Sequence, residues 1–316
     1  MSHSTGISTP GTITFTTIAL IAFAANSVLC RKALGGHEID AASFTLVRLL
    51  TGAVVLSLIL ALNNAKAMND SKLRSNAKGS NVRGSNAKGS WSACLMLFLY
   101  AVTFSYSYNT LNTGTGALLL FGSAQLTMIA FTLVTGTRLH ISEWLGVVIA
   151  FIGFVYLIMP AISIPSFSGF ILMTVAGIAW GIYTLKGRGS QTPLTDTTWN
   201  FIRTLPLLML LVIPMLLHSH VSTNGILLAA LSGGLASGVG YAIWYLALGG
   251  LNTTQAAVVQ LSVPVIAAAG GVIFVAEPIT TRLMLSTLMV LGGMLLVVLG
   301  RYALQRGRAF GKTSKG

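Results

Sequence analysis

Aromatic and amide side chains inside apolar segments are the residues of this chain best suited to bind a small molecule. Tyr241, Trp244 and Tyr245 follow the i, i+3, i+4 spacing that places them on one helix face. Amides such as Asn26 and Gln260 would leave donors and acceptors unsatisfied in an apolar surrounding, so they are expected to point inward. The predicted binding residues are Asn26, Tyr100, Phe104, Tyr108, Gln125, Trp180, Tyr183, Tyr241, Trp244, Tyr245 and Gln260.

An aromatic cavity with a few amide groups suits a neutral or zwitterionic ligand with an apolar or ring portion. In the alternative interpretation, the aromatic side chains only pack between helices and the amides join one helix to another. A membrane-embedded enzyme would need a nucleophile–base pair or a metal-ligand set, and no His, Asp, Glu or Cys cluster is spaced for one. The sequence therefore predicts no catalytic residue, no metal site, no cofactor and no enzymatic activity.

The elements that position these residues are predicted to be membrane-spanning helices. Only 8% of residues are charged and 54% are hydrophobic, whereas about 25% of residues are charged in a soluble domain. From Thr204 to Ala276 no Asp, Glu, Lys or Arg occurs, which is enough chain for several spans of about 20 residues. The predicted fold is an all-α membrane protein with ten transmembrane helices, at residues 12–30, 41–62, 91–111, 114–134, 142–160, 167–186, 195–217, 224–248, 254–276 and 283–304.

The second half of the chain repeats the first. Leu111-Asn112-Thr113 returns as Leu251-Asn252-Thr253, and Arg31 and Arg48 match Lys186 and Arg203 at one constant offset. The predicted repeats are residues 1–160 and 161–316. Because a unit with an odd number of spans re-enters the bilayer upside down, duplication gives two inverted five-helix repeats, an arrangement typical of secondary transporters.

Charge distribution predicts the orientation of the chain. The net charge is +13, but the basic residues fall in alternate loops and not on one folded face, so nucleic acid is not an expected partner. The positive-inside rule places both termini in the cytoplasm of a multi-pass protein of the cell (inner) membrane. Within the first repeat, residues 63–90 contain Ser-Asn-Ala-Lys-Gly-Ser twice, and this low-complexity segment is predicted to be a disordered basic loop.

Few charged residues lie inside the predicted spans. The six acidic residues all fall in loops or at helix ends, which favours facilitated transport or an indirect proton path over a carboxylate relay. Arg48 and Arg203 lie inside helices and have two interpretations: a pair that binds an anion in the cavity, or side chains that reach the interface and tie down loops. Glu277, next to Pro278, is expected to anchor a helix end.

Proline and small residues supply candidate breaks and close contacts. Pro264, Pro206 and Pro214 are each expected to interrupt the hydrogen-bond ladder of a helix, as a kink or a hinge. Ser232, Ala236 and Gly240 lie four residues apart, a spacing that permits close approach of another helix.

The segment from Leu251 to Gly300 combines a small-residue turn, a helix interrupted by Pro264, Glu277 and a Gly-rich final helix. It resembles the second repeat of EamA-type members of the drug/metabolite transporter (DMT) superfamily, and Phe44 with Arg48 resembles the second helix of that family. The resemblance implies a ten-helix carrier that exports amino acids, other metabolites or drugs through a central cavity between the halves. The first repeat departs from a symmetric pattern, since Thr137 stands where the second repeat has Glu277.

Together these features predict a secondary transporter that exports amino acids or related small metabolites by alternating access. The alternatives are a multidrug or cationic-compound exporter and a passive channel. The expected partners are a small-molecule substrate and the lipid bilayer. The sequence leaves the oligomeric state, the coupling ion and the substrate open.

Overall fold

The computed structural model describes residues 9–75, 89–136, 141–158, 166–188, 190–218, 220–251 and 253–313. These residues are helical, apart from short turns and one isolated antiparallel bridge between Ile39 and Val221. The first half contains α1 (Thr9–Gly35), α2 (Ala41–Ser75), α3 (Trp91–Ser107), α4 (Thr113–Val134) and α5 (Ile141–Ile158). The second half contains α6 (Ser166–Gly187), α7 (Pro193–Thr204), the 3₁₀ helix η2 (Leu205–Leu208), α8 (Met209–His218), α9 (Thr223–Ala230), the π-helix η3 (Leu231–Val239), α10 (Gly240–Leu248), α11 (Thr253–Gln260), α12 (Val263–Val275) and α13 (Thr281–Thr313).

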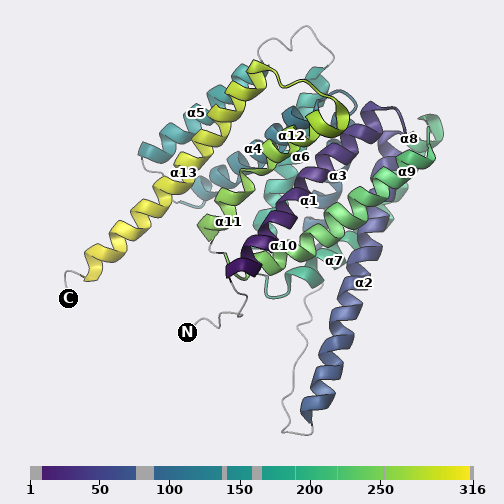
Figure 1. Ribbon diagram of the computed structural model, residues 1–316, viewed down its shortest axis with the longest axis horizontal. Coiled ribbons are helices and arrows are strands. Elements are labelled where there is room, and N and C mark those ends of the chain that lie inside the picture. The colour runs from purple at the N-terminus through teal and green to yellow at the C-terminus, as the bar shows by residue number, and fades with distance from the viewer. Residues whose placement is uncertain are drawn as a thin grey trace.

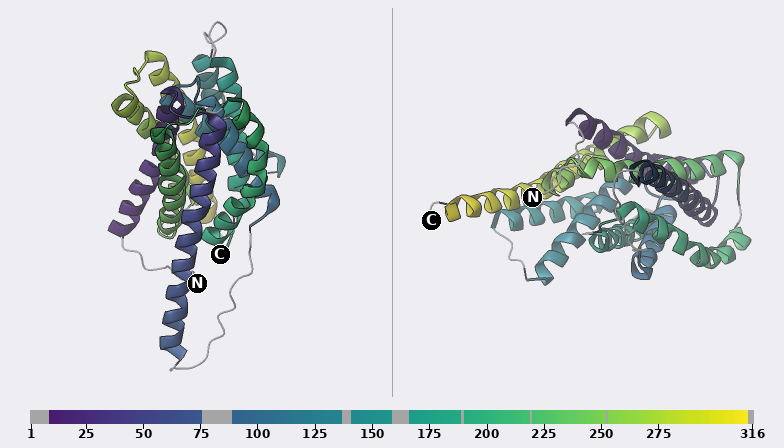
Figure 2. Two further views of the ribbon diagram at one scale, coloured as in Figure 1. Left: turned by 90° about the vertical axis from the view of Figure 1, so that its right-hand side faces the viewer. Right: turned by 90° about the horizontal axis from the view of Figure 1, so that it is seen from below.

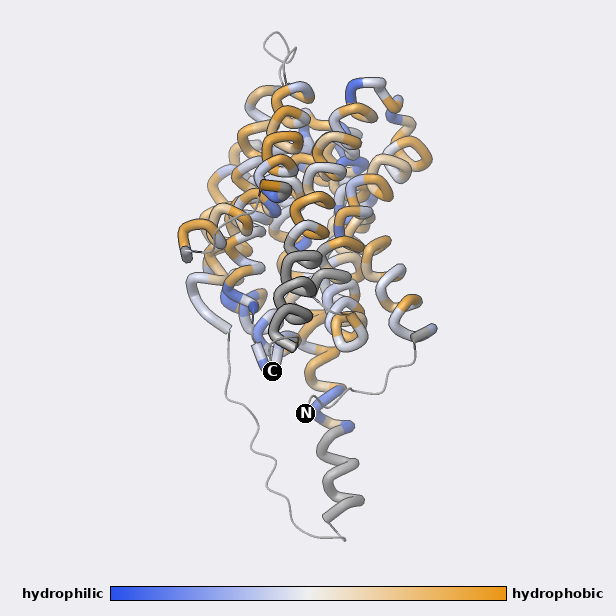
Figure 3. Tube along the Cα trace, turned by 90° about the vertical axis from the view of Figure 1, so that its left-hand side faces the viewer, coloured by the Kyte–Doolittle hydropathy of each residue, from blue (hydrophilic) through white to orange (hydrophobic). Residues whose placement is uncertain are grey.

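Within the described ranges, eight helical stretches are long and apolar enough to cross a membrane. Apolar residues cover most of the tube in Figure 3, and the hydrophilic residues gather toward the helix ends. The eight stretches are Pro10–Gly35, Ala41–Lys66, Thr113–Val134, Phe167–Gly187, Pro193–Leu217, Thr223–Leu248, Val258–Val275 and Thr281–Gly300. Two shorter apolar helices, Trp91–Ser107 and Glu143–Leu157, occupy the places of the predicted third and fifth spans.

Helices from the two halves of the sequence pack against each other throughout the bundle (Figures 1 and 2). α13 lies along α5, and α6 packs against both α3 and α4. α1 contacts α10 and α12, while α2 contacts η3. Because most large interfaces join one half to the other, a cavity in the middle of the bundle is lined by both halves.

Two helices run further than their sequence predicts. α2 continues to Ser75, and α13 continues to Thr313. Residues 63–75 were predicted to begin a disordered loop, and that part of the prediction is wrong. Ala, Lys, Met, Leu and Arg in this stretch are good helix formers, and a helix satisfies its own backbone when it leaves the apolar region. The remainder of that predicted loop, residues 76–88, lies outside the described residues.

The predicted helix at 224–248 is continuous but changes its winding. Its middle turns form the π-helix η3, which contains Gly233. A Cβ atom on Gly233 would lie 2.0 Å from the Arg48 carbonyl oxygen of α2, so only glycine permits this approach of the two backbones. The small residues predicted to allow close packing lie here, and Ser232 and Ala236 are buried against neighbouring helices.

Two predicted proline breaks are observed. α11 ends at Gln260, and α12 begins at Val263 with Pro264 in its first turn. Pro206 lies in the 3₁₀ segment η2, where the seventh predicted helix changes its winding. Proline has no backbone N–H to continue an α-helical ladder, which explains why both helices are interrupted at these positions. Pro214 lies within α8.

Candidate functional site

A cavity of about 730 Å³ lies between the two halves, beside the end of α10. α1 begins at this same end of the bundle (Figure 1). The cavity reaches the surface, because the exposed residues Lys186 and Arg188 belong to its lining. The start of α3, the ends of α6 and α10, and the start of α7 form its walls. The lining residues are Phe23, Gly89, Ser90, Ala93, Trp180, Tyr183, Thr184, Lys186, Gly187, Arg188, Ser190, Pro193, Asp196, Thr197, Asn200, Tyr241, Trp244, Tyr245, Leu248, Gly249 and Gln260.

Stacked aromatic rings form the deep wall of this cavity. The Trp180 ring lies 5.5 Å from the Tyr183 ring and 5.7 Å from the Tyr241 ring, with 27° between the planes of each pair. Phe23 of α1 packs against the same wall, with its ring 5.6 Å from Tyr241 and 5.8 Å from Trp244. This wall therefore contains rings from α1, α6 and α10, and it offers faces and edges to an apolar or aromatic ligand.

Polar groups line the mouth. The Tyr245 and Thr197 hydroxyls form a hydrogen bond with each other. The Asp196 carboxylate accepts from Gly89 N at 2.9 Å and from Ser190 Oγ at 2.6 Å. Gly89 has a φ of +65°, a conformation that glycine adopts without strain. These bonds tie the segment before α3 to the start of α7.

Six of the predicted binding residues line the cavity together: Trp180, Tyr183, Tyr241, Trp244, Tyr245 and Gln260. Tyr100 lies one layer behind them, with its ring 4.9 Å from the Trp180 ring. Phe104 and Tyr108 continue this aromatic row away from the cavity, with 4.9 Å between their rings. The Tyr108 hydroxyl donates to the Thr113 carbonyl oxygen at 3.4 Å.

The amides Asn26 and Gln125 lie outside this lining. Asn26 Oδ1 accepts hydrogen bonds from Ser232 Oγ at 2.8 Å and from Ser237 Oγ at 3.4 Å, so it joins α1 to η3. Gln125 is half-buried on α4. The arrangement of Asn26 matches the interpretation in which an amide joins two helices.

Several lining residues were missed by sequence reasoning. Thr197 and Asn200 line the cavity but were not among the predicted binding residues. Thr197, Asn200 and Thr204 follow the i, i+3, i+7 spacing of one helix face and are all buried. This polar face, at the start of the predicted helix at 195–217, is the sequence signal that indicates an inward-facing surface.

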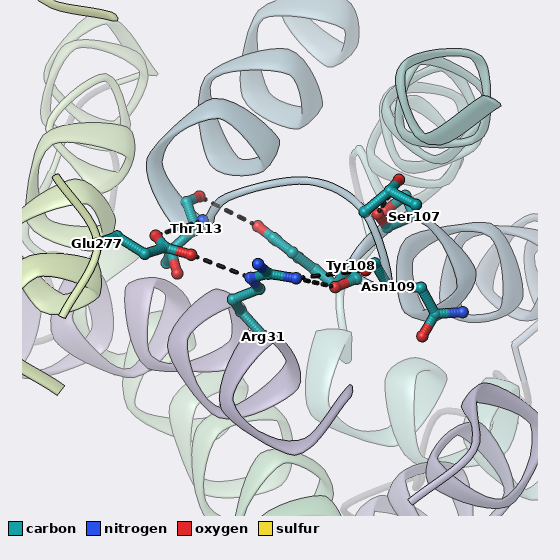
Figure 4. Close-up of polar contacts among 7 residues, drawn as sticks. Arg31, Ser107, Tyr108, Asn109, Thr113 and Glu277 are labelled. Atoms are coloured by element: carbon teal, nitrogen blue, oxygen red, sulfur yellow. Dashed lines mark hydrogen bonds and ion pairs between the residues drawn. The ribbon is translucent and has the colours of Figure 1, made fainter. Parts of the chain in front are cut away.

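At the opposite end of the bundle, an ion pair joins the two halves (Figure 4). Arg31 Nε, at the end of α1, donates to Glu277 Oε1 at 3.0 Å. Arg31 Nη1 donates to the Tyr108 carbonyl oxygen at 3.0 Å and to the Asn109 carbonyl oxygen at 3.4 Å. Glu277 Oε2 accepts from Thr113 N at 2.8 Å. The ion pair thus fixes the α3–α4 turn to the segment that follows α12, in agreement with the predicted anchoring role of Glu277.

A second hollow, of about 640 Å³, lies at this same end. Its lining includes His37, Asp40 and His220. Asp40 Oδ1 accepts from Ala42 N at 3.0 Å and from Ser43 N at 2.9 Å, and so caps α2. Among the residues that the structure describes, no group of three or more His, Cys, Asp or Glu side chains is arranged to hold a metal ion.

Arg48 and Arg203 occupy different environments. Arg48 is 2% exposed, and its Nη2 donates to the Tyr100 hydroxyl at 2.8 Å. Its Cζ lies 4.7 Å from the centre of the Phe104 ring and 5.2 Å from that of Tyr100. Arg203 is half-buried, with Cζ 5.5 Å from the centre of the Trp91 ring. The two sequence-equivalent cations therefore do not form a symmetric pair.

Apolar helices of spanning length around a cavity define a multi-pass membrane protein. The model of the EamA-like transporter family matches twice, at residues 11–159 and 167–299. The chain belongs to this family, which is part of the DMT superfamily, as its sequence resemblance indicated. It is therefore a membrane transporter of the DMT kind, from a family of transporters and not of enzymes.

Proteins similar to the chain include two relatives and a solved structure. An uncharacterized Pseudomonas aeruginosa protein is 43% identical over 295 residues, which is 92% of this chain and 97% of that protein. An uncharacterized transporter of Archaeoglobus fulgidus is 31% identical over 169 residues, covering 51% of this chain and 59% of the relative. One crystal structure superposes with a TM-score of 0.56 at 15% identity, over 90% of this chain and 97% of the other, and this likeness concerns the fold alone.

Proposed function

We propose that this protein is a secondary transporter that exports amino acids or related small metabolites across the cytoplasmic membrane by alternating access. One observation carries the proposal: an aromatic cavity between the halves reaches one end of the bundle, while the Arg31–Glu277 ion pair joins the halves at the other end. A carrier needs such an asymmetry, because its binding site must be open to one side at a time.

The proposed architecture is ten spans in two inverted repeats, residues 1–160 and 161–316. Two features support it. The family model matches each half separately, and α3 and α5 are apolar helices in the places of the two spans that would complete ten. With both termini in the cytoplasm, the cavity faces the cytoplasm of an inner-membrane protein. Accessibility tags at Met1 and Gly316 test this arrangement, and labelling from opposite faces would exclude it.

The substrate is proposed to bind against the stacked rings of Trp180, Tyr183 and Tyr241, with Tyr245 and Gln260 as polar partners. Rings give a large contact area at low entropic cost, and hydroxyl and amide groups fix the orientation of the ligand. Phe104, Tyr108 and Asn26 lie behind this surface and would shape it indirectly.

Counterflow in proteoliposomes tests the function. Vesicles preloaded with each of a panel of amino acids, nucleosides and cationic dyes should take up the same labelled compound when it is a substrate. Tyr245→Ala and Gln260→Ala should lower affinity or flux with no loss of folded protein. Met209→Ala, on an exposed apolar face of α8, is the matched control.

The panel also separates the alternatives. Exchange of cationic dyes alone would indicate a multidrug or cationic-compound exporter. Flux far above carrier rates, without counterflow, would indicate a passive channel. If no compound exchanges, the proposed function is wrong. If a compound exchanges but both cavity variants behave as the wild type, the proposed binding surface is wrong.

A further inference from the structure

We infer that Arg48 binds a carboxylate of the substrate, so that the transported molecules are organic acids, amino acids included, with an aromatic or apolar portion. This inference rests on the proposed function, because it assigns a ligand group to the same cavity.

Arg48 is a buried cation. No carboxylate of the described residues forms an ion pair with it, and its Nη2 hydrogen bonds to the neutral Tyr100 phenol. Its Nη1 is buried and has no hydrogen-bond partner in the described part of the chain. A guanidinium stays charged in proteins and offers five N–H donors in a planar fork. Since a buried charge is costly unless it is paired, an arriving carboxylate would stabilise this group.

Two aromatic side chains, Tyr100 and the lining residue Trp180, separate Arg48 from the cavity. Tyr100 contacts the guanidinium on one side and has its ring 4.9 Å from the Trp180 ring on the other. Trp180 and its stacking partner Tyr241 line the cavity. Rotation of the Tyr100 and Trp180 side chains would open the wall, and the substrate carboxylate would replace the Tyr100 hydroxyl on Arg48. Such rotamer changes are common when a partner binds.

The charges at the cavity mouth favour the same class of ligand. Lys186 and Arg188 are exposed there, and an electropositive mouth attracts anions. Asp196 is the one acidic side chain in the lining as described, and each of its oxygens already accepts a hydrogen bond. A cationic substrate would meet two exposed basic side chains beside this single carboxylate, whereas an anionic one would pass from the basic mouth toward Arg48.

A purely structural role explains the position of Arg203 better than that of Arg48. Arg203 is half-buried and stacks on Trp91, whose ring is largely exposed. A cation in that setting keeps part of its hydration and contributes packing. Arg48 has no such access to water, and packing alone would be served by an uncharged side chain.

The test is calorimetric titration of the purified full-length protein with 3-(indol-3-yl)propionate and with its primary amide. The two probes share one ring system and differ in charge. We expect the wild type to bind the acid roughly 10- to 100-fold more tightly than the amide, as for one hydrogen-bonded charge pair. Arg48→Gln should bind both probes with similar affinity. Tyr100→Phe, which removes the competing hydroxyl, should increase the preference for the acid, and Arg203→Gln should keep the wild-type ratio.

Three results would overturn the inference: a wild type that binds the amide as tightly as the acid, a wild type that does not bind the acid, or an Arg48→Gln protein that keeps the preference. If Arg48→Gln does not fold, Arg48→Lys and Tyr100→Phe decide, because a merely structural arginine leaves the acid-to-amide ratio unchanged in both.

Failure of the proposed function is distinct, since no compound would then exchange by counterflow. Counterflow of neutral or cationic compounds that is insensitive to Arg48→Gln would remove the carboxylate assignment alone.

Discussion

Arg31 Nε lies 3.0 Å from Glu277 Oε1, although 246 residues separate the two along the chain. Both side chains are mostly buried, at 19% and 11% exposure. Each also holds backbone groups of the α3–α4 region: Arg31 donates to the Tyr108 carbonyl oxygen, and Glu277 accepts from Thr113 N. The ion pair is thus the centre of a network that joins α1, the start of α4 and the segment after α12.

Glu277→Gln should weaken closure of this end. The substitution keeps the size of the side chain but removes its charge, and a hydrogen bond to a charged group contributes about 1.5–3 kcal/mol. Thr113 is fully buried beside Glu277. The reactivity of a thiol introduced by Thr113→Cys therefore reports whether this end has opened. In Glu277→Gln, the Thr113→Cys thiol should react with a membrane-impermeant maleimide roughly tenfold faster or more.

The controls for this labelling are available in the chain. The native thiols Cys30 and Cys94 are both buried, and the charge-swapped pair Arg31→Glu with Glu277→Arg should restore part of the protection. If labelling of Thr113→Cys is equally fast with and without Glu277, the ion pair does not close this end.

Trp180→Ala should weaken the binding of aromatic substrates in particular. Trp180 stacks on Tyr183 and on Tyr241, and each aromatic pair contributes about 0.5–1.5 kcal/mol. An aromatic acid that joins this stack should lose affinity in Trp180→Ala and recover part of it in Trp180→Phe. Titration with hexanoate provides the comparison, since an aliphatic acid should lose much less. Equal losses for both acids would mean that the wall offers bulk and not stacking.

The sequence was most informative where composition alone decides the structure. Apolar segments without charges predicted the spanning helices, and Pro264 predicted the interruption that separates α11 from α12. The aromatic face of Tyr241 and Trp244 predicted part of the cavity wall. These features are local, because each depends on residues within a few helical turns.

Features that depend on contacts between the halves could not be read from the sequence. The π-helix η3 accompanies the close approach of Gly233 to the Arg48 carbonyl oxygen, which is a relation between distant segments. The bond from Gly89 N to Asp196 likewise joins residues far apart in the chain. Tyr100 and Phe104 share a helix face with regular spacing, but that spacing does not tell that both rings lie against Arg48, outside the cavity lining.

Gly233→Ala should destabilise the protein. The added Cβ would meet the Arg48 carbonyl oxygen at 2.0 Å and Thr51 Oγ1 at 2.2 Å, and α2 would have to shift. Overpacking of this kind costs about 1–3 kcal/mol, which should lower the midpoint of thermal unfolding in detergent. Gly292→Ala is the matched control, because nothing lies within 4 Å of its added Cβ. Equal unfolding midpoints for the two variants would contradict the prediction, because they would show that α2 and η3 can move apart at little cost in stability.

An imposed pH gradient should not drive uphill accumulation of the substrate. Where the structure describes their side chains, the acidic residues lie at helix ends and not near the middle of a span. Asp40 precedes α2, Glu143 and Asp196 lie in the first turns of α5 and α7, and Glu277 follows α12. Glu277 and Asp196 are held by hydrogen bonds. A relay of carboxylates across the bilayer needs such groups at depth, so the substrate should equilibrate across the membrane and not be concentrated.

Proteoliposomes with an acidic interior and a neutral exterior provide the measurement, with nigericin as the control that dissipates the gradient. Accumulation above the external concentration that disappears with nigericin would show proton coupling and contradict the prediction.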